Sequence, residues 1–159
     1  MARNKDDIVA KASQKIADRI LEGTIGAFSL CCVRLPKSGL YRILGVAGEF
    51  PRKNIIPLDF KAGQGGTGGT VVKTGVPRLA HDYLMEYTNS PFRKTADSMS
   101  VRSLIIAPMG KKLPTYGVVY VIGRQPNMFT RGDLNRLIAE ARVAEVALEM
   151  AMDQAGWKY

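Results

Sequence analysis

The stretch of this chain with the most unusual potential for chemistry is a glycine-rich segment at residues 63–69. Residues 63–68 fit the G-x-G-x-x-G pattern of dinucleotide-binding loops, and Asp82 follows at about the spacing of the acidic residue that binds the ribose. That motif requires a parallel strand before it and a full crossover helix after it. Gly75 and Pro77 end any helix here after about two turns, so the sequence argues against a Rossmann-type site. The glycines are expected to let the backbone turn sharply, and their amides are candidate donors to an anion.

The two cysteines, Cys31 and Cys32, are neighbours in a predicted strand. Adjacent strand residues point to opposite faces, so a disulfide between them would be strained. Together with His81, the single histidine, they are too few for a structural zinc site, and no metal is predicted. We expect both thiols to be buried and structural. A thiol-based redox sensor or reductase that uses Cys31 or Cys32 is the alternative.

Composition and charge limit the classes of function. The 159 residues are 46% hydrophobic, which is enough for a core, and we expect one domain over residues 1–159. The net charge is +9, but the basic residues occur in ones and twos, so nucleic-acid binding is disfavoured and kept only as a further alternative. No apolar run approaches the ~18 residues of a membrane span, and the charged N-terminus lacks a signal core. We therefore expect a cytoplasmic protein without a membrane partner.

The elements that would position any site are organised around two β-branched runs at residues 104–109 and 116–124. A short connector containing a proline joins them, which predicts an antiparallel hairpin. The second run is apolar on both of its faces. Val118, Tyr120 and Ile122 lie on one face, and Val119 and Val121 lie on the other. A strand that is apolar on both faces is covered on both faces, so this hairpin is predicted to lie inside a sheet.

The remaining pattern completes an α+β plan with an N-terminal helix at residues 5–23, a sheet and excursion at 27–123 and a C-terminal helix at 130–153. Strands at 27–35 and 40–47 form a first hairpin, in which alternation places Phe28, Leu30 and Cys32 on one face and Ser29, Cys31 and Val33 on the other. We expect one antiparallel sheet of about five to six strands. The terminal helices would cover one face, and the excursion at residues 48–100 would cover the other.

The C-terminal helix carries two apolar stripes. The main stripe is Leu134, Leu137, Ile138, Ala141, Ala144, Leu148 and Ala151, and it is expected to pack on the sheet. The second stripe is Ala139, Val143, Val146 and Met150. A second apolar stripe predicts a second buried surface, and the simplest partner is the same helix of another copy in a homodimer.

Several groups of residues, in this order and spacing, resemble the motifs of GAF domains. They are residues 66–77 followed by Asp82 and Tyr83, then Arg102 and Ser103 with Pro108 and Met109, then residues 116–121, and last Phe129 and Thr130 with Asp133, Leu134 and Leu137. The resemblance covers roughly residues 5 to 153. It implies a GAF-like (PAS/profilin-like) α+β fold, in which short helices and loops form a small-molecule pocket on the sheet face opposite the terminal helices.

The departures from the family pattern narrow the function. Thr67, Gly68 and Thr70 stand where GAF domains usually carry apolar or aromatic residues, so the pocket roof is expected to be looser or more polar. The excursion lacks the cysteine that bilin-binding members need, which excludes a phytochrome-like role. Methionine sulfoxide reductases of this fold need cysteines in the pocket loops, whereas Cys31 and Cys32 lie in a strand.

We therefore predict a stand-alone, non-catalytic signalling module without a cofactor. It would bind an unidentified small molecule between the sheet and the excursion, and signal through its terminal helices in a homodimer, with a signalling protein as a further partner. No catalytic residue is predicted. The candidate ligand-binding residues are Ser29, Cys31, His81, Tyr83, Arg102, Ser103 and Tyr120.

Overall fold

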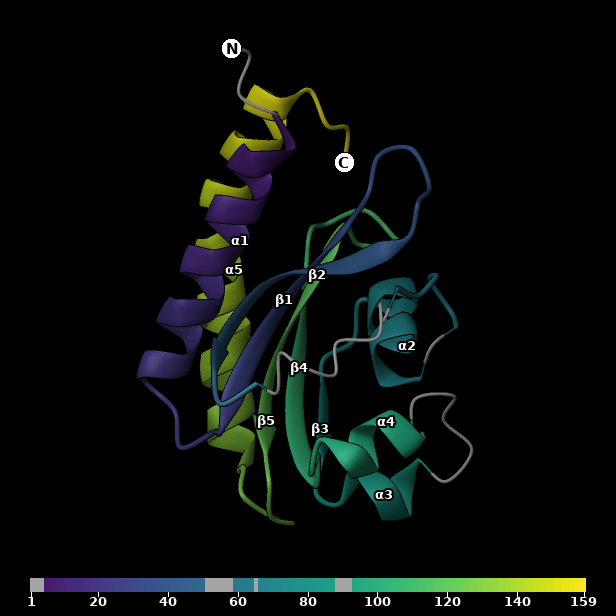
Figure 1. Ribbon diagram of the computed structural model, residues 1–159, viewed down its shortest axis with the longest axis vertical. Coiled ribbons are helices and arrows are strands. Elements are labelled where there is room, and N and C mark those ends of the chain that lie inside the picture. Colours follow the sequence, from purple (N-terminus) through teal and green to yellow (C-terminus); the bar gives the residue numbers. More distant parts are fainter. Residues whose placement is uncertain (1–4, 51–58, 65, 88–92) are drawn as a thin grey trace.

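The predicted central hairpin lies inside the sheet, as expected from its two apolar faces. β4 (Ser103–Met109) and β5 (Gly117–Gly123) pair antiparallel, with Ile105 opposite Val121. The structure is a computed structural model that describes residues 5–50, 59–64, 66–87 and 93–159 (Figure 1).

The first hairpin extends the sheet on one side. β1 (Phe28–Arg34) pairs antiparallel with both β2 (Tyr41–Gly48) and β5, and β3 (Arg78–Ala80) pairs with β4 at the other edge. The strand order in the described residues is β2-β1-β5-β4-β3, all antiparallel. The prediction of an α+β fold with one antiparallel sheet of about five to six strands is confirmed.

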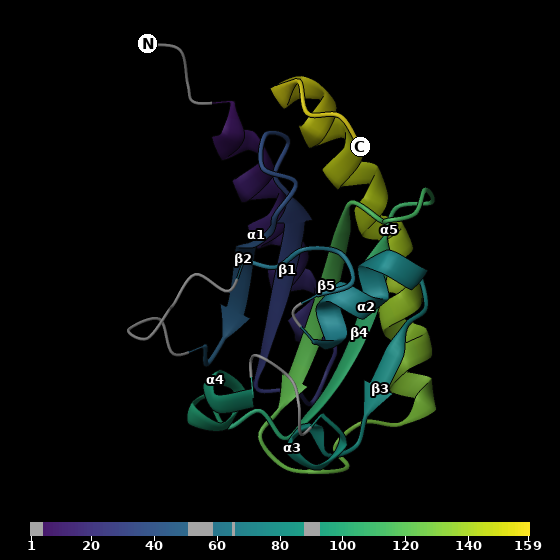
Figure 2. The ribbon, with the colours of Figure 1, turned by 90° about the vertical axis from the view of Figure 1, so that its right-hand side faces the viewer.

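Two long helices cover one face of this sheet. α1 (Asp6–Glu22) and α5 (Arg131–Ala155) lie side by side behind it, as both ribbon views show (Figures 1 and 2). The main apolar stripe of α5 is buried there, and Thr130 caps the helix through reciprocal hydrogen bonds with Asp133. Trp157 folds back and donates its indole Nε1–H to the Asp6 carboxylate over 2.9 Å, which joins the two chain ends.

Short helices cover the opposite face. α2 (Thr67–Thr74), α3 (Tyr83–Glu86) and α4 (Arg93–Ser98) lie in front of the sheet (Figure 2). Gly75 ends α2 with a φ of 70°, the left-handed conformation that glycine adopts readily. The sheet therefore separates two apolar cores, one against α1 and α5 and one against the short helices. In the described part of the chain, no helix is long and apolar enough to cross a bilayer.

Candidate functional site

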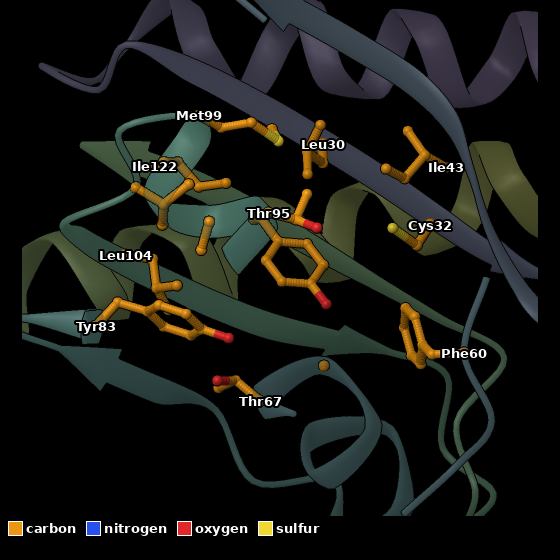
Figure 3. Close-up of a pocket in the computed structure, with 14 residues that line it drawn as sticks. Leu30, Cys32, Ile43, Phe60, Thr67, Tyr83, Thr95, Met99, Leu104 and Ile122 are labelled. Atoms are coloured by element: carbon orange, nitrogen blue, oxygen red, sulfur yellow. The ribbon is translucent and has the colours of Figure 1, made fainter. Parts of the chain in front are cut away.

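A cavity of about 100 Å³ lies between the front face of the sheet and the short helices (Figure 3). Strands supply its floor, and α2, α3 and α4 with their flanking residues supply its roof and sides. The described lining residues are Leu30, Cys32, Ile43, Leu104, Tyr120 and Ile122 from the strands, and Phe60, Thr67, Gly68, Tyr83, Thr95, Ala96, Met99 and Val101 from the other segments.

Strand alternation explains which residues form the floor. Leu30 of β1 lies opposite Tyr120 of β5, and both point to the front because every second residue of a strand shares a face. Cys32 and Ile122 follow on the same two strands. The strand residues between them point to the helical layer, so one pair of strands contributes to both cores.

Hydroxyl groups gather at the α2 end of this otherwise apolar cavity. The Oγ1 atom of Thr67 is buried and has no hydrogen-bond partner among the residues that the structure describes. The Tyr120 hydroxyl lies directly against Gly68, where even one added methyl group would overlap it. Figure 3 shows Tyr83 and Thr67 on the same side of the cavity. Burial raises the pKa of Tyr120, and Cys32 and Tyr83 raise it further, so its phenol is neutral.

Of the seven predicted ligand-binding residues, four lie on the two faces of the sheet or its cover, and three lie at one end of the sheet. Tyr83 and Tyr120 line the cavity. Ser29 and Cys31 do not, which corrects the prediction: both face the helical layer. Ser29 Oγ donates to the carbonyl oxygen of Ala17 over 2.6 Å, and Cys31 belongs to the core behind the sheet. The alternation in β1 was predicted correctly, but the polar face was assigned to the pocket.

The other three predicted residues lie at the end of the sheet and have partners outside the cavity. His81 is exposed, and its carbonyl oxygen accepts from the Asn127 amide over 2.7 Å. Arg102 forms an ion pair with Asp82 at 3.0 Å. Ser103 Oγ donates to a backbone carbonyl on the segment after β5, at Gln125. None of the three lines the cavity.

Sequence reasoning missed most of the lining, although signals existed for part of it. Leu30, Cys32 and Ile122 follow from the alternation, once the front face is known. Thr67 and Gly68 stood out as departures from the GAF pattern. Phe60, Ile43, Thr95, Ala96, Met99 and Val101 gave no signal of a pocket, because their contacts depend on how distant segments fold over the sheet.

The two thiols are free, buried and in different cores. Burial raises the pKa of Cys31 to about 12, against a small lowering by a hydrogen bond with Ser13. Burial also raises the pKa of Cys32, and the neighbouring Cys31 and Asp59 add to the effect. Both groups are thiols rather than thiolates at neutral pH. Across the described residues, no three His, Cys, Asp or Glu side chains are arranged to hold a metal ion.

A second hollow of about 540 Å³ runs along the outer surface between α1 and α5. Of the four predicted dimer residues, Val143 and Met150 line this hollow, and Val146 lines a separate hollow beside Tyr116 and Lys111. All four are exposed. Val143, Val146 and Met150 retain 51%, 65% and 59% of their accessible surface, and Ala139 is exposed too. The described part of the chain therefore leaves the large apolar side chains of Val143, Val146 and Met150 uncovered.

Comparison with known proteins gives matches in structure alone. No protein-family model matches the chain, and no curated protein does. A type II free methionine-R-sulfoxide reductase from Thermoplasma acidophilum superposes with a TM-score of 0.71 at 13% identity, over 93% of this chain and 96% of that one.

Two GAF domains superpose to a similar degree. The GAF-B domain of DevS from Mycobacterium smegmatis matches with a TM-score of 0.66 at 20% identity, over 92% of this chain and 96% of that one. The PixJ GAF domain of Thermosynechococcus elongatus matches with a TM-score of 0.74 at 8% identity, over 94% and 90%. Together with the sheet order and the two helical layers, these similarities show that the chain has the GAF-domain fold.

Proposed function

We propose that this protein is a regulatory module that binds a small molecule in the front cavity and carries out no chemistry on it. The observation that carries the proposal is the cavity itself: a hollow lined by apolar side chains, with the Thr67 hydroxyl at one end, which has no hydrogen-bond partner within the described chain. Concave apolar sites with a few polar groups are the usual form of small-molecule sites.

The chemistry of the lining supports binding rather than catalysis. Among the described lining residues there is no carboxylate, imidazole or amine that could act as a general acid or base. Cys32 is the only nucleophile of the thiol type in the lining, and burial keeps it protonated. Both tyrosine hydroxyls are better suited to hydrogen bonding than to proton transfer at neutral pH.

The central strands offer a route from the cavity to the helices. Leu30 and Tyr120 contact the cavity, whereas their strand neighbours Cys31 and Val121 belong to the core that includes α1 and α5. Close packing transmits small displacements, so a ligand that shifts β1 or β5 would also shift the helical layer. In the proposed scheme, the two ligand states differ in how α1 and α5 present their outer surface.

The outer surface of α5 is the proposed dimer interface. Its strip of exposed apolar side chains consists of Val143, Val146 and Met150. Exposed apolar patches often mark interaction sites, and a second copy would cover this one in a symmetric contact. Val146→Glu would place a charge in this contact and is expected to convert the dimer to a monomer in sedimentation velocity. Thr74→Glu adds the same charge at an exposed position of α2, away from α5. It serves as the control and should remain dimeric. A wild-type monomer at all concentrations would remove the dimer from the scheme.

The binding proposal is tested by screening small metabolites against the ¹⁵N-labelled protein. A true ligand is expected to shift the amide signals of β1, β5 and α2 together and to raise the melting temperature. Compounds that shift only surface signals, or a complete screen without shifts in these three elements, would count against a receptor role.

Reductase activity is the second candidate function. The matching structures include a free methionine-R-sulfoxide reductase, and in this chain the Cys32 thiol does reach the cavity. A direct assay with free methionine-R-sulfoxide and dithiothreitol separates the two candidates. Binding without chemistry predicts no turnover above the rate of a Cys32→Ala variant, whereas turnover that depends on Cys32 would make the protein an enzyme.

A further inference from the structure

We propose that the ligand is a small neutral molecule with an apolar body and one carbonyl or hydroxyl group, which takes the unfilled hydrogen bond of Thr67. This inference rests on the proposed function and names the chemical class that the same cavity accepts. Three properties of the cavity lead to it: its size, the absence of charge in its described lining, and the position of its polar end.

The volume of the cavity allows it to enclose a ligand, or part of a ligand, of a few atoms. Its volume is about 100 Å³. A dry engineered cavity of about 150 Å³ holds one benzene molecule, so this one has room for about four or five non-hydrogen atoms. Nucleotides, bilins and the amino acids larger than glycine exceed this space.

The described lining favours a neutral molecule. Leu30, Leu104 and Ile122 form an apolar floor, and no Lys, Arg, His, Asp or Glu side chain is among the described residues around it. The nearby carboxylate of Asp59 is held by Arg42 through hydrogen bonds of 2.7–3.2 Å. An ion in contact with these described residues would lose its water without gaining an opposite charge from them, which is strongly unfavourable.

The polar end of the cavity selects a hydrogen-bonding group. Thr67 is 3% exposed, and its Oγ1 makes no hydrogen bond within the described chain. A buried hydroxyl without a partner destabilises the empty protein, and a ligand oxygen would restore the missing bond. Figure 3 shows the Thr67 side chain directed toward the cavity from α2, with Tyr83 beside it. A ketone or alcohol oxygen fits this end, and the hydrocarbon part fits the floor.

Three probe compounds of about five non-hydrogen atoms each separate these requirements: butan-2-one, cyclopentane and propanoate. Each is titrated into the ¹⁵N-labelled wild-type protein, Thr67→Val and Thr74→Val. The Thr67 variant keeps the side-chain shape and removes the hydroxyl. The Thr74 variant makes the same change on the same helix, at an exposed position outside the cavity.

We expect butan-2-one to bind the wild type in the cavity and propanoate not to bind there. In Thr67→Val, butan-2-one should bind about tenfold more weakly, the effect of one lost hydrogen bond. Cyclopentane should bind both proteins within about twofold, and Thr74→Val should behave as the wild type. Because the Thr67 variant removes an unpartnered group, it should melt at the wild-type temperature or above.

Two results would overturn the inference and leave the proposed function in place: equal affinity of butan-2-one for wild type and Thr67→Val, or preferred binding of propanoate. If none of the three probes shifts the signals of β1, β5 and α2, the neutral-ligand inference fails. The metabolite screen then decides the proposed function separately, because a larger or charged compound that shifts those signals would support a receptor of another class.

Discussion

Gly68 offers the most direct test of how the cavity is built. It is a helical residue of α2, and a Cβ atom at this position would overlap the hydroxyl oxygen of Tyr120 and lie 3.2 Å from the ring of Phe60. Gly68→Ala therefore forces the Tyr120 side chain to move within the cavity. Because Tyr120 also forms part of the cavity floor, the variant should reduce ligand binding as well as stability.

The expected change in the free energy of unfolding of Gly68→Ala follows from two opposing effects. Alanine stabilises a helix interior by about 1 kcal/mol relative to glycine. Forcing an extra methyl group into a packed region costs about 1–3 kcal/mol. We expect a net destabilisation of up to about 2 kcal/mol, which lowers the melting temperature by about 2–4 °C for each kcal/mol in a chain of this length.

Gly132→Ala is the matched control for the stabilisation that alanine gives a helix relative to glycine. Gly132 lies in the first turn of α5, and an added Cβ would meet only Thr130 Oγ1, at 3.5 Å. This variant should be as stable as the wild type or up to about 1 kcal/mol more stable.

Removing the Tyr120 hydroxyl oxygen, which the added Cβ would overlap, should restore the stability that Gly68→Ala loses. In Gly68→Ala with Tyr120→Phe, the added Cβ meets the ring carbon at 3.1 Å, a close contact but one that a small shift relieves. Urea unfolding of the two single variants and the double variant gives the coupling free energy, which we expect to be favourable by about 1–2 kcal/mol. If Gly68→Ala is stabilised as much as Gly132→Ala and the coupling is zero, Tyr120 does not pack against α2 and the description of the cavity wall is wrong.

Three further predictions address other parts of the molecule. Trp157→Phe removes the hydrogen bond to Asp6, so it should lower the free energy of unfolding by about 1 kcal/mol and speed amide exchange in the first turn of α1. The hydrogen bond from Arg102 lowers the pKa of Asp82, so the ion pair stabilises the folded protein above about pH 4. This stabilisation is lost as the pH falls through the lowered pKa. The difference in melting temperature between wild type and Arg102→Met should therefore close toward about pH 2. Burial raises the pKa of Cys31 to about 12, so the stability of the wild type relative to Cys31→Val should be constant below about pH 8.5 and fall at higher pH, as measured by urea unfolding.

The sequence determined much of the sheet because strand alternation is a local property. The residues that share a face in β5 follow directly from their order, and the structure has them as predicted. Alternation alone does not say which face meets the helices. Ser29 looked like a ligand contact because it is polar, yet its hydroxyl is satisfied by the Ala17 carbonyl of α1. A polar residue buried against a helix is indistinguishable in sequence from one that faces a ligand.

The roof of the cavity was less predictable for a different reason. Phe60 lies outside the named strands, bridges to Tyr41 and stacks on its ring with centroids 5.2 Å apart. Thr95 comes from α4, a helix too short for a periodic pattern. Such contacts depend on the path of long connections over the sheet, which no short-range pattern records. Two local signs of this roof existed: the predicted ligand contact at Tyr83, and the departure at Thr67 and Gly68, of which Thr67 stands at the polar end.

An irregularity in the pairing of β1 with β2, where β2 carries the extra residue Leu44, indicates where a change in the cavity would first reach the helical layer. The pairing of β1 with β2 shifts between Cys31 and Cys32, so the thiol that lines the cavity and the thiol that faces the helices lie at the same bulge. Behind it, Gly45 of β2 lies so close to the backbone of Ser13 in α1 that no side chain fits between them. Backbone contacts of this kind leave no flexible side chain to absorb a displacement. In the proposed scheme, a ligand that moves Cys32 therefore displaces α1 before α5, and the dimer surface responds through the contact between the two helices.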